Sequence, residues 1–142
     1  MKSAVWAVVP VKTLGNAKER LAPILSPAER ANLSRTMLAD VFNALAGCSG
    51  LRGVLVVTND VDARSLSRKH GFDTFDDLVC TGPSEAVRGG LAHLGNRDCD
   101  GILALMADIP LLAAEDIDEI LTAHKGTPTV TLVPSRDCLL YT

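Results

Sequence analysis

The stretch AVWAVVPV, residues 4–11, decides the fold, because apolar residues follow one another there without a charge. Strands that are covered on both faces of a sheet have such continuous apolar runs, whereas half-exposed strands alternate apolar and polar residues. Two further runs, VLVVT at 54–58 and ILALMA at 102–107, have the same character. The sequence therefore predicts buried strands at these three places, a weaker strand at 72–75 and a last strand at 129–133.

Helical patterns lie between the predicted strands. Ser26, Pro27 and Glu29 have the spacing of a helix N-terminus with a capping box, and Gly47 supplies a stop. The expected inner face of this helix consists of Leu33, Met37, Val41 and Leu45, widened by Leu38 and Phe42. Shorter helices are predicted at about 62–70, after Gly82-Pro83, and from about 115 to Gly126.

This alternation of strands and helices predicts an α/β fold, with a mostly parallel sheet covered by helices on both faces. At 142 residues the chain is one domain at most. In such sheets ligands bind at the carboxyl ends of the strands. Candidate site residues are therefore sought directly after each predicted strand.

Composition narrows the class of protein. The net charge of −3 argues against nucleic acid and anionic membranes as partners. No apolar run approaches the ~18 residues of a membrane span, and no cleavage site precedes the first strand, so a cytoplasmic location is expected. Four scattered cysteines show no metal-binding spacing and are expected to be buried thiols, namely Cys48, Cys80, Cys99 and Cys138.

The loop after the first predicted strand concentrates positive charge. Lys12, Lys18 and Arg20 lie within nine residues, and Gly15-Asn16 between them is a turn signal. A triphosphate that loses pyrophosphate needs positive charge on its β and γ groups, which lysine and arginine supply. A solvated loop is the alternative, and the residues alone leave the two interpretations even.

A single carboxylate stands at the end of the apolar run 102–107. Asp108 follows that run directly, and Pro110 turns the chain away from the sheet. A carboxylate in this position can hold Mg²⁺ together with substrate phosphates. A turn or capping role is the alternative, but the absence of a nearby Lys or Arg in the sequence argues against a simple salt bridge.

Two other strand ends give weaker signals. Thr58, Asn59 and Asp60 follow the second strand and are predicted to be capping groups rather than ligands. The loop LVCTGPSE, 78–85, is a candidate base-binding segment.

The chain has neither a Walker A loop nor a dinucleotide-binding glycine pattern. Nucleotidyl transfer needs no general base, because a phosphate monoester with a second pKa near ~6 is already mostly ionised.

The block VPVKTLGNAKERLAPILSPAERANLSRTMLADV, 9–41, resembles the opening of the 2-phospho-L-lactate guanylyltransferase family, and ADIPLL, 107–112, is shared more widely. The resemblance covers residues 4 to about 137. It implies a nucleotide-diphospho-sugar transferase (glycosyltransferase-A-like) fold and a role in coenzyme F-420 biosynthesis. The implied reaction transfers GMP from GTP to 2-phospho-L-lactate, phosphoenolpyruvate or 3-phospho-D-glycerate, with release of pyrophosphate.

The resemblance also implies roles for particular residues. The implied catalytic group is Lys18, Arg20 and Asp108, with Asp108 as the Mg²⁺ ligand. The implied nucleotide-binding residues are Lys12, Gly15, Lys18, Arg20, Gly82 and Ser84. Ser84 stands where the family pattern has Asn, so the sequence leaves the choice of base open.

The end of the chain departs from the family pattern. After VPSRD, 133–137, a Gly-rich stretch is expected, but the chain has CLLYT, 138–142. An incomplete, N-terminal part of a nucleotidyltransferase domain is therefore expected, and a homodimer is compatible with it. Two alternatives stay open. One is a molybdenum-cofactor-type or sugar-phosphate nucleotidyltransferase, although the single Gly15 fits their Gly-rich loop poorly, and the other is a catalytically inactive nucleotide-binding fragment.

Overall fold

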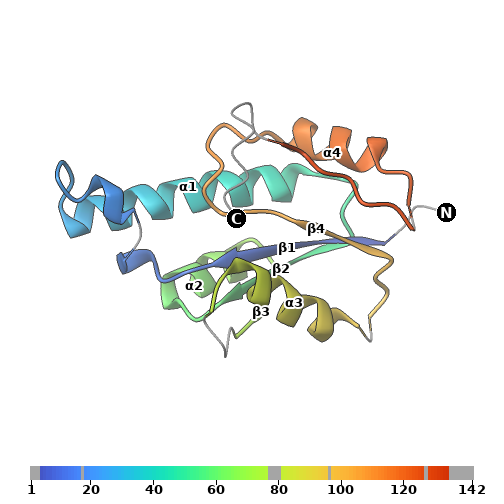
Figure 1. Ribbon diagram of the computed structural model, residues 1–142, viewed down its shortest axis with the longest axis horizontal. Helices are drawn as coiled ribbons and strands as arrows, with labels where there is room; N and C mark the ends of the chain where they lie inside the picture. Colours follow the sequence, from blue (N-terminus) through green and yellow to red (C-terminus); the bar gives the residue numbers. More distant parts are fainter. Residues whose placement is uncertain (1–3, 17, 77–80, 96, 127, 135–142) are drawn as a thin grey trace.

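A computed structural model describes residues 4–16, 18–76, 81–95, 97–126 and 128–134. Strands and helices alternate along the chain, as Figure 1 shows. The strands are β1 (Val5–Val11), β2 (Gly53–Thr58), β3 (Asp73–Phe75) and β4 (Gly101–Ala104). The helices are α1 (Pro27–Gly47), α2 (Val61–Lys69), α3 (Pro83–Leu94) and α4 (Ala114–Ala123), with short 3-10 turns η1 (Leu14–Asn16) and η2 (Glu19–Leu21). Within these residues, no helix is both long and apolar enough to cross a lipid bilayer.

The four strands form one parallel sheet in the order β3-β2-β1-β4. β1 lies between two neighbours, pairing Val8 with Leu55 of β2 and with Ala104 of β4. A strand with neighbours on both sides and helices on both faces has no solvent-facing side, so its residues from Ala7 to Val11 are buried. This position explains the continuous apolar run, and the predicted parallel α/β architecture is confirmed.

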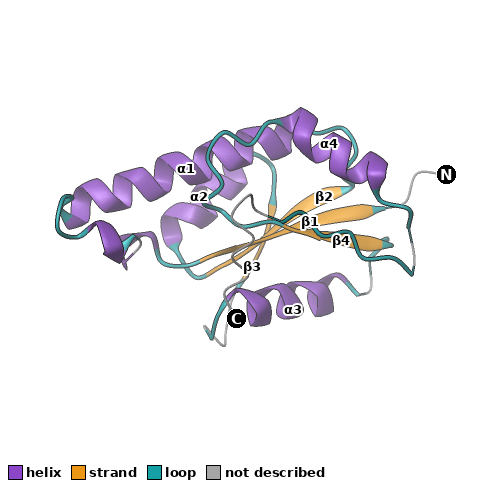
Figure 2. Cartoon of the chain, turned by 45° about the horizontal axis from the view of Figure 1, so that its top comes forward, coloured by secondary structure: helices purple, strands orange, loops and turns teal. Residues whose placement is uncertain are grey.

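Successive residues of β1 face two different hydrophobic clusters. Val9 packs in the larger cluster with α1, α2 and α4, and Val8 packs in the smaller one with α3. Figure 2 shows α1, α2 and α4 on one side of the sheet and α3 on the other. The sheet is therefore the middle of three layers, and its strand ends are left to line a site.

Two helices have the N-terminal capping residues that the sequence predicted. The Ser26 hydroxyl accepts a hydrogen bond from Glu29 N at 3.2 Å, and the Glu29 carboxylate accepts one from Ser26 N at 2.7 Å. Together these bonds form the capping box of α1. Asp60 caps α2 in the same manner, because its Oδ1 accepts from Ala63 N at 2.9 Å.

The inner face of α1 differs from the predicted stripe at its start. Leu33 is 36% exposed, whereas Ser34 is only 8% exposed and precedes the buried Leu38 by one helical turn. The packed face therefore begins with a polar side chain. A four-residue apolar repeat could not reveal this, because it assigns Leu33 to the core and Ser34 to solvent.

The strands predicted at 102–107 and 129–133 differ from the structure. β4 is shorter than the run 102–107, and its residues are half-buried or exposed because it lies at the edge of the described sheet. The strand predicted at 129–133 is wrong: these residues are neither helix nor strand, and Val130 is 84% exposed. Apolar β-branched residues form a strand only when a neighbour pairs their backbone groups, whereas Thr129 N bonds locally to Gly126 O at 3.0 Å.

The two described cysteines are half-buried rather than buried. Cys48 Sγ donates a hydrogen bond to Asp118 Oδ1 at 2.9 Å. Burial raises the pKa of the Cys48 thiol, and the Asp118 carboxylate raises it further. Burial also raises the pKa of Cys99. The other two predicted thiols, Cys80 and Cys138, lie outside the described residues.

Candidate functional site

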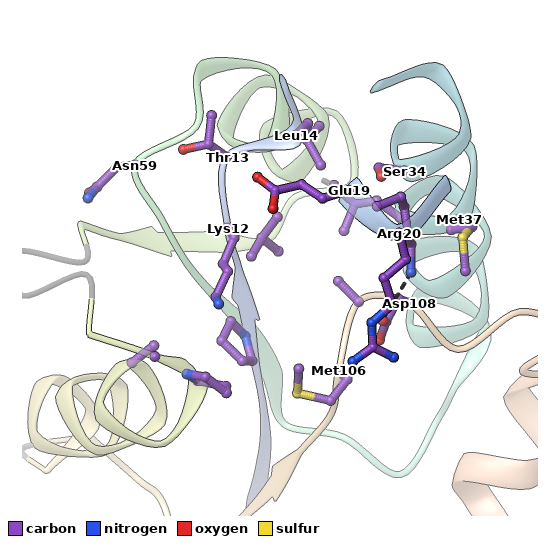
Figure 3. Close-up of a pocket in the computed structure, with 18 of the residues that line it drawn as sticks. Lys12, Thr13, Leu14, Glu19, Arg20, Ser34, Met37, Asn59, Met106 and Asp108 are labelled. Carbon is purple, nitrogen blue, oxygen red and sulfur yellow. Dashed lines mark hydrogen bonds and ion pairs between the residues drawn. The ribbon is translucent and has the colours of Figure 1, made fainter. Parts of the chain in front are cut away.

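A cavity of about 850 Å³ lies at the carboxyl end of β1, where ligands are expected in a parallel sheet. Its walls come from η1, η2, α1, the start of α3 and the segment after β4. Figure 3 shows its side chains. The polar and charged residues that line it are Lys12, Thr13, Lys18, Glu19, Arg20, Ser34, Asn59 and Asp108.

The three predicted cations all line this cavity. Lys12 directly follows β1, Lys18 precedes η2, and Arg20 lies within η2. Figure 3 shows the Arg20 side chain beside Asp108 and Met106, with Lys12 on another side of the same space. A loop that turns back on itself thus directs positive charge toward one volume, which favours a ligand with several anionic groups.

The predicted metal ligand has a cation as its partner. Lys18 Nζ donates to Asp108 Oδ2 at 3.2 Å, and the two side chains are 27% and 55% exposed. The expectation that Asp108 takes no part in a simple salt bridge is therefore wrong. Its partner lies 90 positions away in the sequence and is brought to Asp108 only by the fold.

The backbone of Lys18 is in the left-handed region, with φ 58° and ψ 40°. Residues other than glycine, asparagine and aspartate rarely adopt this backbone conformation, because their Cβ atom then crowds the following carbonyl oxygen. The strained residue is thus the one that makes the ion pair with Asp108. Strained backbone of this kind is concentrated at functional sites.

Asp60 anchors the cationic loop to the fold. Its Oδ2 accepts a hydrogen bond from Leu14 N at 3.0 Å while its Oδ1 caps α2. The Thr58 hydroxyl in turn accepts from Asp60 N at 3.0 Å. The predicted capping role of Asp60 is thus confirmed, whereas the Thr58 hydroxyl makes a local turn bond and caps no helix. The third residue, Asn59, lines the cavity instead.

The candidate base-binding segment is only partly described. Gly82 and Pro83 line the cavity, whereas residues 78–80 lie outside the described part of the chain. Gly82 has φ 144°, a conformation that glycine adopts far more readily than other residues. Gly15 and Ser84 are described but are not among the residues that line the cavity.

Several lining residues escaped the sequence reasoning. Glu19 stood inside the cationic run, and its charge could have drawn attention to it. In Figure 3 its carboxylate extends toward the side where Thr13 lies. Ser34 gave no usable signal, because a serine within a helix is ordinary on an exposed face. Only the packing of α1 brings it to the cavity wall.

The carboxylates that line the cavity are the candidate ligands for a divalent cation. Within the described ranges, no group of three or more histidine, cysteine or acidic side chains is placed to hold a metal. Asp108 and Glu19 are the described carboxylates that line the cavity, and Asp108 is the one that follows a strand end. Mg²⁺ commonly uses one or two carboxylates and completes its coordination with substrate phosphates and water.

Comparison with solved structures supports the fold. A nucleotide-diphospho-sugar transferase structure from Desulfovibrio desulfuricans G20 superposes with a TM-score of 0.68 at 17% identity, covering 86% of this chain and 54% of that one. A CMP:2-keto-3-deoxy-manno-octonic acid synthetase in complex with CTP superposes with a TM-score of 0.59, also at 17% identity, covering 84% and 46%. The predicted nucleotide-diphospho-sugar transferase fold is therefore confirmed.

Comparison of sequences identifies the family. Phosphoenolpyruvate guanylyltransferases from Conexibacter woesei and Rubrobacter xylanophilus are 33% and 37% identical over 94% and 92% of this chain. The chain spans 60% and 63% of the length of these two relatives. The family model described as "Guanylyl transferase CofC like" matches residues 5–139. The chain therefore belongs to the CofC-like guanylyl transferase family.

Proposed function

We propose that the chain forms the nucleotide-binding part of a guanylyltransferase, which transfers GMP from GTP to a phosphorylated three-carbon acid. Phosphoenolpyruvate is the preferred acceptor in this proposal, because the relatives carry that substrate in their names. A place in coenzyme F-420 biosynthesis belongs to the same proposal. The observation that carries it is the convergence of Lys12, Lys18, Arg20 and Asp108 on one cavity.

The proposed reaction joins two anions. A phosphate oxygen of the acid attacks the α-phosphorus of GTP, a new P–O bond forms, and the bond to the β-phosphate breaks to release pyrophosphate. Positive charge is needed both to bring the anions together and to stabilise the leaving pyrophosphate. Lys18 and Arg20 supply that charge in the proposal, and Lys12 holds the phosphate chain near the end of β1.

No residue has to act as a general base. The attacking phosphate monoester is mostly ionised near neutral pH, because its second pKa is near ~6. Orientation and charge neutralisation then account for the chemistry. This agrees with the lining of the cavity, which combines three cations with Asp108 and Glu19 and has no histidine or cysteine among its described residues.

Asp108 is the proposed Mg²⁺ ligand. When bound, Mg²⁺ would neutralise phosphate charge and help to orient the groups that react. Asp108 would then exchange its Lys18 partner for the metal, and the Lys18 ammonium would turn to a phosphate oxygen. Lys18 is suited to this exchange, because its Nζ interacts with Asp108 in a part of the cavity that is open to solvent.

Nucleotide binding tests the first part of the proposal. Calorimetry on the 142-residue chain should show tighter binding of GTP than of GMP, because the cations contact the β and γ phosphates. Lys18→Ala and Arg20→Ala should weaken GTP binding more than GMP binding. Lys69→Ala, on the far end of α2 and outside the cavity, removes the same charge and should leave both affinities unchanged. Equal losses of GTP and GMP affinity in the cavity variants would contradict the assignment.

Transfer is measured on the full product of the coding region, because the chain spans only about 60% of its relatives. GTP and Mg²⁺ are incubated with phosphoenolpyruvate, 2-phospho-L-lactate or 3-phospho-D-glycerate, and pyrophosphate is assayed. Release that depends on phosphoenolpyruvate is expected. Release that depends on a different acid would correct the acceptor, and release with none of the three would refute the proposed reaction.

A further inference from the structure

One buried hydroxyl in the cavity wall has no hydrogen-bond partner. Ser34 lies on α1, is 8% exposed, and lines the cavity on the same side as Arg20 and Met37 (Figure 3). Among the described residues, only Ser34 Oγ and Arg30 Nε are buried side-chain polar atoms without a partner. These two residues lie one helical turn apart, on the same face of α1.

Several other helical hydroxyls among the described residues are satisfied locally. A serine or threonine within a helix usually donates to the carbonyl four residues earlier. Ser67 Oγ does so to Ala63 O at 2.7 Å, and Thr122 Oγ1 to Asp118 O at 2.8 Å. Ser34 departs from this pattern although it is buried, where an unsatisfied hydroxyl reduces stability. A bound ligand that accepts the hydrogen bond would remove that cost.

The residues around Ser34 indicate which chemical group would accept its hydrogen bond. Arg20 lines the same cavity, with its guanidinium beside Asp108 (Figure 3), and Arg30, one turn before Ser34 but not among the lining residues, has an unpaired Nε on that face of α1. No described side chain accepts a hydrogen bond from Ser34 Oγ. Among the groups of the proposed substrates, a phosphoryl group offers the most anionic acceptor oxygens to a hydroxyl and a guanidinium.

We propose that Ser34 is a ligand-positioning residue, whose hydroxyl donates a hydrogen bond to a phosphoryl oxygen that Arg20 also contacts. The inference rests on the proposed function, since it needs a phosphorylated substrate in the cavity. The phosphoryl group comes from the nucleotide or from the acid acceptor, and both present the same oxygen chemistry. GTP, GMP, pyrophosphate and phosphoenolpyruvate as separate ligands distinguish the two sources.

The test compares Ser34→Ala with Ser67→Ala, which removes a buried helical hydroxyl that is already satisfied. Thermal unfolding of the ligand-free proteins and calorimetry with the four ligands are measured on each. Ser34→Ala should unfold at the same temperature as the wild type or higher, because an unsatisfied polar group is lost. Its affinity for at least one of the ligands should fall ~10-fold or more, the scale of a hydrogen bond to a charged oxygen. Ser67→Ala should unfold earlier and bind as the wild type does.

Three results would overturn the inference, and they are distinguishable. A wild type that binds none of the four ligands refutes the proposed function and this inference with it. A wild type that binds, together with a Ser34→Ala variant that binds every ligand equally well, refutes the role of Ser34 alone. Destabilisation of Ser34→Ala to the extent of Ser67→Ala would show that the hydroxyl already has a partner within the protein.

Discussion

Lys18 and Asp108, 90 positions apart in the sequence, form an ion pair in the cavity, with Nζ 3.2 Å from Oδ2. The pair connects the cationic loop after β1 to the proposed metal ligand after β4, so these two segments of the candidate site are in contact through it. An exposed pair of this kind contributes about 1 kcal/mol or less to stability. Its importance therefore lies in ligand binding rather than in folding.

Asp108→Asn should have opposite effects with and without Mg²⁺. Without the metal, the variant should bind GTP at least as tightly as the wild type, because a negative charge is lost and Lys18 is released. With Mg²⁺, it should bind GTP more weakly, and turnover of the full coding-region product should fall by ~100-fold or more through loss of a metal ligand. Calorimetry with and without Mg²⁺ and an assay for pyrophosphate measure these effects.

Asp62→Asn is the matched control for this experiment. It removes the carboxylate of another exposed ion pair, Arg35–Asp62, whose members do not line the cavity. Its GTP affinity should match that of the wild type under both conditions. If Asp108→Asn retained full Mg²⁺-dependent turnover, Asp108 would not be the metal ligand.

Most of the fold could be predicted from the sequence because its signals are local. The apolar run of β1 and the capping box at Ser26 depend on neighbouring residues alone. The position of the site followed from the rule for parallel strand ends, which brings Lys12 and Asp108 to one edge. What failed depended on distant partners: the absence of pairing at 129–133, the inward turn of Ser34, and the ion pair of Asp108.

The left-handed backbone conformation of Lys18 leads to a second prediction, which concerns stability. Lys18→Ala and Lys18→Gly both remove the ion pair, so their difference isolates the backbone. Glycine avoids roughly 1–2 kcal/mol of steric strain in the folded state. Its greater conformational freedom in the unfolded chain reduces this gain in stability by about 0.4–1 kcal/mol. Lys18→Gly should therefore be more stable than Lys18→Ala by about 0.5–1 kcal/mol in denaturant unfolding.

Leu111 allows the same comparison away from the ion pair. It also has a positive φ, 67°, and its side chain is 95% exposed, so little packing is lost on truncation. Leu111→Gly should exceed Leu111→Ala in stability by a similar amount. Alanine variants as stable as the glycine variants at both positions would show that neither backbone is strained.

The capping box makes a prediction about pH. Hydrogen bonds from the backbone and then the side chain of Ser26 lower the pKa of the Glu29 carboxyl below its ordinary value of 4.5. A lowered pKa in the folded state stabilises the protein above the unfolded-state pKa, and this contribution is lost as pH falls through the folded-state value. Glu29→Gln keeps a side chain suited to a capping box but cannot titrate.

The difference in stability between the wild type and Glu29→Gln should therefore be constant from pH 7 to about pH 5 and decline at lower pH. Thermal unfolding at a series of pH values measures it. A difference that grows as the solution is acidified would have the wrong sign for a lowered pKa and would contradict the role of the capping box.

The two hydrogen bonds of Asp60 can be separated by substitution. Its Oδ1 caps α2 at Ala63 N, and its Oδ2 accepts from Leu14 N in the loop that carries Lys12 and Lys18. Asp60→Ala removes both bonds and should reduce the free energy of unfolding by roughly 2–3 kcal/mol. Asp60→Asn keeps one oxygen, and because asparagine caps helices as well as aspartate, that oxygen should remain at Ala63 N.

In Asp60→Asn, the amide group then faces Leu14 N, where two donors oppose each other and the loop loses its anchor. The variant should be more stable than Asp60→Ala, yet its GTP affinity should fall by about as much, because both release the cationic loop. Chemical denaturation and calorimetry with GTP on the two variants give the two quantities independently. If GTP affinity instead decreased in parallel with stability from the wild type to Asp60→Asn to Asp60→Ala, the loss of affinity would result from destabilisation of α2 as a whole. The specific link between Asp60 and Leu14 would then have no part in positioning Lys12 and Lys18.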